Sequence, residues 1–302
     1  MRPGAGLAAV SLASPGERVK IEAGLRELEG LGFAVAPPET LPREGYFAGG
    51  EEERLAQLRQ SLRHKDSAGI VAVRGGYGTS SLLGALARTD FGEVKALIGY
   101  SDVTALQIFL WQTLGWVTFY GPMVASGFDA GAGNPGGYDR PSFVQALRET
   151  ESGWSVELLG STLERGEAEG VLLGGCMTLV ESTLATPWEL STEGAILLLE
   201  DRGMKPYQVD RLLTHLKQAG KLSGLRGVVL GEFPECEPPE KGSPSVVDVC
   251  RRILGRLGVP VVWGAPIGHT ARPMLTLPLG VRARLRASGS GRLDTLEPAV
   301  RA

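Results

Sequence analysis

Residues 94–113 read VKALIGYSDVTALQIFLWQT and predict a strand, a sharp turn and a helix in immediate succession. The apolar run 94–99 is typical of a buried strand, and 103–113 carries apolar residues at helical spacing. Ser101 falls on the turn between these two elements, beyond the carboxyl end of the predicted strand. Because open parallel sheets bind their ligands at that end, the stretch indicates both a fold and the place of a functional site.

The same alternation of strand and helix continues outward through the first half of the chain. Such alternation favours a parallel sheet that is covered by helices on both faces. Residues 125–140 interrupt the pattern, since they are rich in Gly, Asp, Asn and Pro and predict an irregular segment. The predicted strands are 6–12, 32–36, 69–73 and 116–120, and the predicted helices are 16–31, 51–65, 80–87 and 141–150.

The second half has elements of its own. They are predicted helices at 177–184, 207–219 and 245–257, predicted strands at 195–199 and 227–230, an exposed loop at 235–244, and short strands toward the end. At roughly 150 residues per domain, a chain of 302 residues favours two domains. We therefore expect an α/β protein: an N-terminal doubly wound parallel-sheet domain at 1–160, a polar linker at 161–169, and a smaller C-terminal α/β domain at 170–302.

The composition excludes several classes of function. A formal net charge of -3 supplies no basic field that would attract nucleic acid or an anionic membrane. The three cysteines form no C-x-x-C pair and there are three histidines, so we expect no metal site. We expect no cofactor either. No apolar run reaches the roughly 18–20 residues of a membrane span, and no targeting segment is recognisable. Together with the low, odd cysteine count, this predicts a soluble cytoplasmic protein.

Ser101 has two interpretations. Serine at the start of a helix commonly serves only as the N-cap, and from this segment alone that role is the commoner one. The alternative is a nucleophile, because the strand-to-helix turn resembles a nucleophile elbow, although Val103 replaces the second Gly of G-x-S-x-G. The free amides and partial positive charge at a helix N-terminus, including the amide of Asp102, would favour a developing oxyanion.

A glycine loop follows an earlier predicted strand, where residues 71–83 read VAVRGGYGTSSLL. Such a loop lets backbone amides approach a ligand closely. It lacks the Lys and Ser/Thr of a P-loop and is not G-x-G-x-x-G, so a nucleotide site is poorly supported. The amide of Gly76 is compatible with a second oxyanion donor, and Arg74 could pair with a substrate carboxylate. The alternative for this segment is a tight turn with a solvated Arg74.

An acid and a base complete the candidate site. Glu200 and Asp201 end an apolar strand, which suits a functional carboxylate but also suits a turn residue. His269 lies in a glycine-flanked loop, where histidines are often simply exposed. His64 falls in a charged run and His215 in an amphipathic helix, so His269 is the default base by elimination. Either carboxylate could orient it.

Taken together, these segments resemble the LD-carboxypeptidases, a serine peptidase family that also includes the microcin C immunity peptidases. Each shared motif is short, but their order over almost the whole chain is specific. The motifs are RPG at 2–4, ASP at 13–15, RGGYG at 74–78, GYSDVT at 99–104, GGC at 174–176, TPW at 186–188, LED at 199–201, PY at 206–207, DRL at 210–212, GH at 268–269 and LPLG at 277–280.

The resemblance implies a role for each candidate residue. Ser101 is the nucleophile, Glu200 the acid and His269 the base, and the amides of Asp102 and Gly76 form the oxyanion hole. The site lies in the cleft between the two domains, and the family often forms homodimers. The chain departs from the family at two positions near the cleft, with Cys176 where many members have Asn and Thr270 where many have Gly. Both departures could alter substrate preference, and neither removes a member of the triad.

The resemblance also implies a reaction, which is metal-independent hydrolysis of the L,D amide that releases terminal D-alanine from a murein tetrapeptide during cell-wall recycling. A related alternative is an immunity-type peptidase that cleaves peptide–nucleotide amides, with Trp188 as a possible platform for a base. The structural interpretation of Trp188 is a core or hinge aromatic. A third hypothesis, from another class, is a non-catalytic protein whose glycine loop binds an anion.

Overall fold

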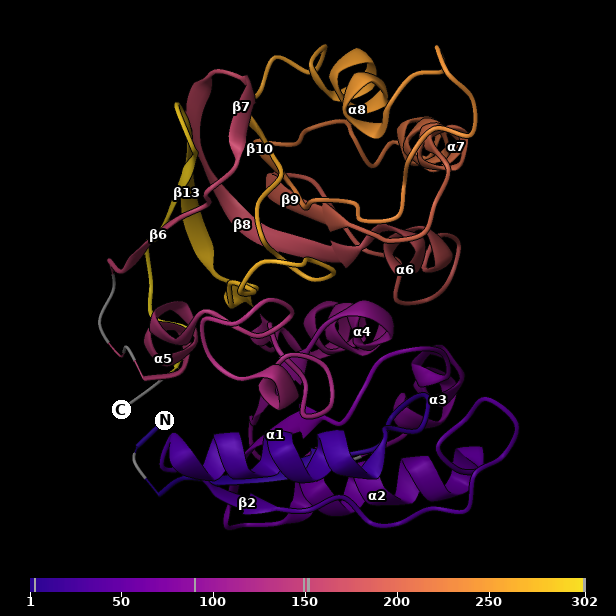
Figure 1. Cartoon of the computed structure of the whole chain (residues 1–302), viewed down its shortest axis with the longest axis vertical. Helices are drawn as coiled ribbons and strands as arrows, with labels where there is room; N and C mark the ends of the chain where they lie inside the picture. The colour runs from indigo at the N-terminus through magenta and orange to yellow at the C-terminus, as the bar shows by residue number, and fades with distance from the viewer. Residues whose placement is uncertain (3, 90, 149, 151–152, 301–302) are drawn as a thin grey trace.

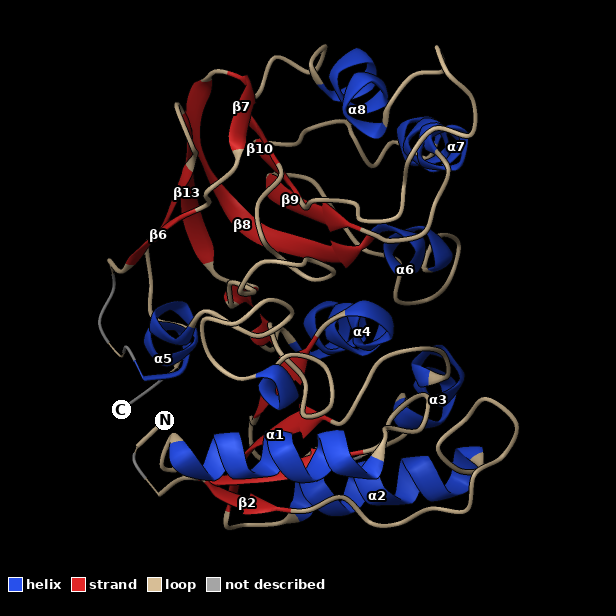
Figure 2. Cartoon of the chain, viewed as in Figure 1, coloured by secondary structure: helices blue, strands red, loops and turns tan. Residues whose placement is uncertain are grey.

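The computed structural model describes residues 1–302 except 3, 90, 149, 151–152 and 301–302, and it contains two β-sheets with helices packed on them (Figure 1). Figure 2 shows the first sheet and its helices in the lower half of the view and the second sheet in the upper half. The first sheet is built from β1 (Gly6–Val10), β2 (Ala34–Ala36), β3 (Ser67–Ala72), β4 (Ala96–Gly99), β5 (Thr118–Tyr120) and β12 (Leu277–Leu279).

The first sheet has the order β12-β5-β4-β3-β1-β2, and its strands are parallel except for β12. The chain first moves outward from β1 to β2 and then returns to β3 on the other side of β1. Right-handed crossovers therefore place the first helix on one face and the next three on the opposite face. The doubly wound prediction is confirmed, and β1/β3 is the point where the strand order reverses. The helices are α1 (Arg18–Gly30), α2 (Glu51–Arg63), α3 (Thr79–Leu86), α4 (Thr104–Leu114) and α5 (Arg140–Arg148).

The second sheet has four parallel strands at its centre and antiparallel strands on both sides. Its order is β6-β14-β13-β8-β9-β10-β11-β7, and α6 (Met177–Ser182), α7 (Pro206–Gln218) and α8 (Val246–Leu254) pack on it. The strands are β6 (Ser155–Glu157), β7 (Ser161–Glu164), β8 (Gly166–Cys176), β9 (Ala195–Glu200), β10 (Gly227–Leu230), β11 (Val261–Trp263), β13 (Arg282–Ala287) and β14 (Arg292–Thr295).

The edges of the second sheet lie close together. Residues 158–160 connect the edge strand β6 directly to the opposite edge strand β7. The amides of Leu158 and Gly160 donate to the carbonyls of Gly291 and Ser290, at 2.8 Å and 2.9 Å. The sheet is therefore strongly curled, as accumulated strand twist allows.

The predicted linker at 161–169 is wrong, because these residues form β7 and the first part of β8. Their polarity reflects pairing across strands and not an irregular segment. Glu167 accepts from Arg286, and Glu169 from Arg284, so the acidic residues of β8 face the arginines of β13. Opposite charges on neighbouring strands stabilise a sheet surface.

No single point in the sequence separates the two sheets, because β6 precedes residue 160 but joins the second sheet, and β12 follows residue 170 but joins the first. The predicted domains at 1–160 and 170–302 stay a prediction.

Most other elements agree with the sequence. The helices predicted around Ser101 and in the second half are present, as are the irregular segment after residue 125, which contains one short 3-10 turn (Phe128–Ala130), and the loop after residue 235. Two sequence expectations touch positions outside the described residues, namely the helix predicted at 141–150, at 149, and the RPG motif, at 3. None of the helices formed by the described residues has both the length and the hydropathy that a membrane span needs.

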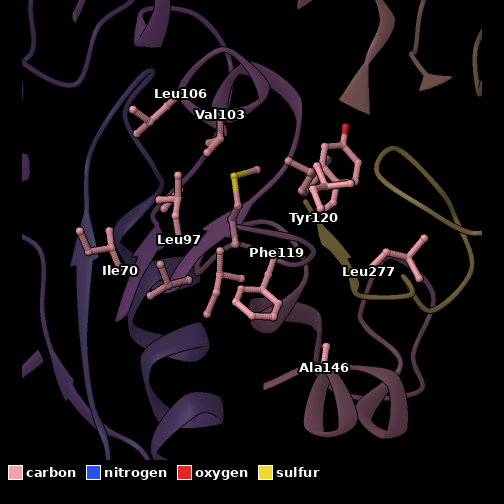
Figure 3. Close-up of a cluster of buried hydrophobic side chains, with 14 of the residues drawn as sticks. Ile70, Leu97, Val103, Leu106, Phe119, Tyr120, Ala146 and Leu277 are labelled. Carbon is pink, nitrogen blue, oxygen red and sulfur yellow. The ribbon is translucent and has the colours of Figure 1, made fainter. Parts of the chain in front are cut away.

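The core of the first sheet fixes the turn that carries Ser101. Figure 3 shows Ile70 and Leu97 of neighbouring strands packed with Val103 and Leu106, which lie just after the turn. All four side chains are buried. Truncating a buried leucine to alanine typically costs about 2–5 kcal/mol, so this packing holds β4, the turn and α4 in one arrangement.

Candidate active site

The two sheets meet at a cavity of about 530 Å³ at the carboxyl ends of their central strands. From the first sheet, the turns after β3 and β4 reach the cavity, and from the second sheet the ends of β8 and β9 reach it. This is the edge at which open parallel sheets bind ligands. The lining residues are Glu17, Lys20, Arg74, Gly75, Gly76, Tyr100, Ser101, Met123, Ala125, Ser126, Cys176, Thr178, Leu179, Asp201, Arg202 and His269.

Ser101 lies on the turn, with φ of 61°, in the left-handed region that non-glycine residues seldom adopt. It begins the 3-10 helix η1 (Ser101–Val103), which runs directly into α4. Outliers of this kind cluster at functional sites, where the surrounding structure holds them in place. Gly75 permits this placement, because a methyl group there would lie 3.1 Å from Ser101 Oγ. No local sequence signal distinguishes Gly75 from the other glycines of its loop.

The side chain of Asp102 holds the turn in place. It is buried, and its Oδ2 accepts hydrogen bonds from the amide of Thr79 at 2.8 Å and from Thr79 Oγ1 at 2.5 Å. Burial raises the pKa of this carboxyl, and the hydrogen bonds from Thr79 oppose that shift. The carboxylate thus caps α3, whose own N-cap residue is Gly78. This contact ties the glycine loop to the turn that bears Ser101.

Ser14 holds the glycine loop through hydrogen bonds and close packing. Gly76 has φ of 111°, and a methyl group there would lie 2.3 Å from Ser14 Oγ. The amide of Ser14 donates to the carbonyl of Gly75 at 3.2 Å, and Ser14 Oγ accepts from the amide of Tyr77 at 3.3 Å. In the part of the chain that the structure describes, the amide of Gly76 donates to no protein acceptor. It is therefore available to a ligand in the cavity.

Arg54 supports the same loop from the protein interior. Its guanidinium is buried and donates to the carbonyls of Gly78 and Leu12, each at 2.8 Å, and to that of Gly49 at 3.0 Å. A buried arginine with several backbone acceptors fixes the segments that supply them. Arg54 therefore joins the end of β1 to the loop after β3, and sequence reasoning did not identify it.

Glu200 is fully buried at the end of β9 and contacts His269. Its Oε2 lies 2.8 Å from His269 Nδ1 and accepts from the His269 amide at 2.9 Å. Asp201 also lines the cavity but has other partners, since its Oδ2 accepts from Thr178 N at 2.9 Å and from Thr178 Oγ1 at 2.6 Å. The structure therefore pairs Glu200, and not Asp201, with the histidine.

The loop that carries His269 is fitted closely around the carboxylate. Gly268 has φ of 60°, and a methyl group there would lie 2.3 Å from Glu200 Cδ. On the other side, Glu232 accepts hydrogen bonds from Thr270 Oγ1 and from Arg272 Nε. Thr270, one of the two departures from the family pattern, thus anchors the loop and leaves His269 facing the cavity.

Two further side chains surround the carboxylate. Tyr120 Oη donates to Glu200 Oε1 at 2.5 Å and accepts from the Ser101 amide at 3.4 Å. The sequence predicts Tyr120 only as the last residue of an apolar strand, and no local signal distinguishes it from a core aromatic. Cys176 is paired with Glu200 across β8 and β9, and burial raises the pKa of its thiol well above the ordinary value. A neutral thiol is a poor nucleophile.

The two predicted substrate-binding residues lie in different surroundings. Arg74 lines the cavity and donates to the carbonyl of Pro15 at 3.0 Å. Trp188 is half-buried and packs edge-to-face on Phe109, with ring centroids 5.7 Å apart. Trp188 is not among the described residues that line the cavity. Nor do the described residues include a group of three or more His, Cys, Asp or Glu side chains placed to hold a metal ion.

Family profiles cover both halves of the chain. The LD-carboxypeptidase N-terminal domain matches residues 6–121, and the LD-carboxypeptidase C-terminal domain matches residues 169–285. The chain belongs to the LD-carboxypeptidase family. It is therefore a hydrolase of the peptidase class, as the resemblance implied.

Individual relatives agree with the family. A probable murein peptide carboxypeptidase of Bacillus subtilis is 35% identical, over 92% of this chain and 88% of its own length. The muramoyltetrapeptide carboxypeptidase structure from Oxalobacter formigenes has 29% identity and a TM-score of 0.83, over 96% of this chain and 98% of that one. The microcin C7 self-immunity protein MccF of Escherichia coli is 26% identical over 86% of this chain and 83% of its own. The LD-carboxypeptidase fold of this chain is thus confirmed, and the similar proteins include both murein peptide carboxypeptidases and an immunity protein.

Proposed function

We propose that this chain is a serine peptidase that hydrolyses the L,D amide bond releasing terminal D-alanine from murein tetrapeptide. The observation that carries the proposal is the buried Glu200 carboxylate, 2.8 Å from His269 Nδ1, beside the cavity that Ser101 and His269 both line. A buried carboxylate on a histidine orients an imidazole base. Binding of an anion by the glycine loop does not require a carboxylate–histidine pair. The hypothesis of a non-catalytic anion-binding protein is therefore less well supported.

Proton transfer follows from this pairing. Donation of Nδ1–H to Glu200 leaves Nε2 of His269 as the acceptor. Ser101 Oγ attacks the amide carbonyl carbon while its proton passes to Nε2, and the amides of Gly76 and Asp102 donate to the oxyanion. The C–N bond then breaks, and His269 returns the proton to the nitrogen of the leaving D-alanine. Water attacks the acyl-serine with His269 again as base, which releases the acid and restores Ser101.

The charges around the cavity suit an acidic peptide. Lys20, Arg74 and Arg202 line it from three different segments, together with the carboxylates of Glu17 and Asp201. Lys20 Nζ lies 3.3 Å from Glu17 Oε1 and Arg202 Nη2 lies 2.5 Å from Glu235 Oε1, so Arg74 is the cation of this set without a carboxylate partner among the described residues. The leaving D-alanine ends in a carboxylate, and a murein tetrapeptide carries others. Guanidinium and ammonium groups bind carboxylates through charge-assisted hydrogen bonds. Arg74 therefore supports a substrate that carries a carboxylate.

Cleavage of peptide–nucleotide amides is the second candidate function, because the chain also resembles an immunity protein. A nucleobase site would be supported by an aromatic platform in the cavity. Trp188 packs on Phe109 instead, and the ring of Tyr100 is already edge-on to His269, with centroids 5.2 Å apart. The murein substrate is the better supported of the two.

The cellular setting is part of the proposal. A product of murein turnover would be processed in the cytoplasm, a reducing compartment that suits the three free cysteines. By family resemblance the active form is a homodimer, which sedimentation velocity would test directly.

The deciding experiment compares the wild type with Ser101→Ala on murein tetrapeptide, following release of D-alanine by mass spectrometry. We expect the wild type to release D-alanine and the variant to lose at least about three orders of magnitude in kcat. The same peptide ending in L-alanine controls for stereochemistry. Equal turnover by both proteins would refute the serine mechanism. Cleavage of a peptide–nucleotide amide but not of the tetrapeptide would favour the second candidate.

A further inference from the structure

The hydroxyl of Tyr120 joins the candidate nucleophile to the candidate acid. Figure 3 shows the ring against the apolar cluster, with its oxygen pointing away from that cluster. Its Oη lies 2.5 Å from Glu200 Oε1 and 3.4 Å from the Ser101 amide. Tyr120 ends β5 of the first sheet, whereas Glu200 ends β9 of the second. One buried phenol thus bridges the two sheets at the site.

The chemistry of the groups fixes the direction of these bonds. The Ser101 amide can only donate, so the phenol oxygen accepts from it, and the phenol proton goes to the Glu200 carboxylate. Burial, and then the nearby Glu200 charge, raise the pKa of Tyr120 well above its ordinary value. The phenol therefore stays protonated and remains a donor over the range in which enzymes work.

The carboxylate depends on this donor. Glu200 is fully buried, and both bonds from His269 go to Oε2. In the described part of the chain, Tyr120 supplies the hydrogen bond to Oε1. Without it Oε1 would be a buried, charged oxygen with no donor, which is costly, and the carboxylate would be free to turn away from His269.

The ring of Tyr120 is itself firmly held. A methyl group at Gly175 would lie 3.0 Å from Tyr120 Cε2 and 2.7 Å from Thr104 Oγ1, so the bare backbone of β8 leaves room for both. Tyr100 packs edge-on against the ring, with centroids 6.3 Å apart. The backbone of Tyr120 pairs with Gly99 on one side and with Leu277 on the other. The hydroxyl is therefore preorganised.

We propose that Tyr120 is a positioning residue of the candidate triad: its hydroxyl fixes the Glu200 carboxylate toward His269 and secures the strained Ser101 turn to the same carboxylate. The inference rests on the proposed function for its catalytic consequence. Its structural consequence, a fixed Glu200–His269 pair, can be measured without any substrate.

The test is Tyr120→Phe, with Tyr138→Phe as the matched control. Tyr138 is also fully buried and donates to a glutamate, Glu27 Oε1, at 2.8 Å, outside the set of residues that line the cavity. We expect Tyr120→Phe to lower kcat by about tenfold to a hundredfold with KM within threefold, as loss of a hydrogen bond to a charged group predicts. Tyr138→Phe should change kcat less than threefold even if both variants lower the unfolding temperature.

The second readout is the proton on His269 Nδ1, observed by NMR in a chain with three histidines. It should give a downfield resonance in the wild type and in Tyr138→Phe, and shift upfield or broaden in Tyr120→Phe. An unchanged resonance, a kcat within threefold of wild type, or equal losses in both variants would overturn the inference. If the wild type cleaves no murein peptide, the proposed function fails while the resonance still decides on positioning. If Tyr120→Phe does not fold, replacement of Tyr120 by 3-fluorotyrosine keeps the ring. This variant should shift the His269 resonance and leave those of the other two histidines unchanged.

Discussion

Replacing Glu200 with Gln tests the assigned acid, because it keeps the size of the side chain and removes its charge. Three donors face the carboxylate, namely His269 N, His269 Nδ1 and Tyr120 Oη. If the new NH2 group faces His269, Nδ1 must give up its proton, and the proton on Nε2 then blocks transfer from Ser101. If the oxygen faces His269, the tautomer is kept but the charge that stabilises the imidazolium is lost.

Either orientation should be severe. Neutralising the acid of a comparable triad costs roughly 10⁴-fold in kcat, so we expect a loss of about 10³- to 10⁴-fold, or about 4–5.5 kcal/mol of transition-state stabilisation. The assay is D-alanine release under saturating tetrapeptide, with circular dichroism melting to show that the variant is folded. KM should change little, since Glu200 lies beneath His269 and is not among the cavity-lining residues within the described ranges.

Asp201→Asn is the control, because it neutralises the adjacent carboxylate. The amide oxygen of the substituted side chain can still accept from Thr178 as the Asp201 carboxylate does, and the expected loss in kcat is less than tenfold. The assignment is wrong if Glu200→Gln keeps kcat within tenfold of the wild type. It is equally wrong if Asp201→Asn loses as much as Glu200→Gln.

Two other perturbations test the turn and one buried thiol. Gly75→Ala would place a methyl group 3.1 Å from Ser101 Oγ, so kcat/KM should fall at least about tenfold in the same assay, and activity within twofold of wild type would contradict the close approach. Burial raises the pKa of Cys250 to about 12, so the thiol favours the folded state below its unfolded pKa and this stability is lost as pH rises toward the folded pKa. Between pH 8 and 10 the free energy of unfolding, measured in urea, should fall about 1 kcal/mol more in wild type than in Cys250→Ala, and equal falls would refute the burial argument.

Sequence periodicity was enough to predict the frame of the site. The strand and helix around Ser101 have unambiguous patterns because both are buried, and the turn between them is too short to be misplaced. Local patterning also placed Glu200 at a strand end and His269 in a glycine-bounded loop. The bond between them joins residues far apart in sequence, so composition and spacing alone left Asp201 as an equal candidate until the structure showed which carboxylate faces the imidazole.

The groups that support the site were not predictable in the same way. Tyr120 has the pattern of any buried strand residue, and Arg54 that of a charged residue on an amphipathic helix. Their roles come from partners on other elements, such as the carbonyl of Gly78 for Arg54. The predicted linker at 161–169 failed for the same reason, because its acidic residues are explained by arginines more than a hundred residues away on β13.

Backbone hydrogen bonds of the residues that follow His269 limit how far the two sides of the cavity can move apart. The amide of Gly136 donates to the carbonyl of Ala271 at 2.9 Å, and Met274 exchanges backbone hydrogen bonds with residues 137 and 139. The chain then enters β12, which pairs with β5 of the first sheet.

The loop that carries His269 is therefore bonded to the sheet that carries Ser101, although Glu200 belongs to the other sheet. A hinge that swung the second sheet away would have to break these backbone bonds, at about 0.5–1.5 kcal/mol each, or pull His269 from Glu200. Either change would raise the free energy of the open conformation of the free protein. We therefore expect His269 and Glu200 to stay paired in the free protein, in the cavity that Ser101 also lines, so that substrate binding does not have to bring the two sheets together.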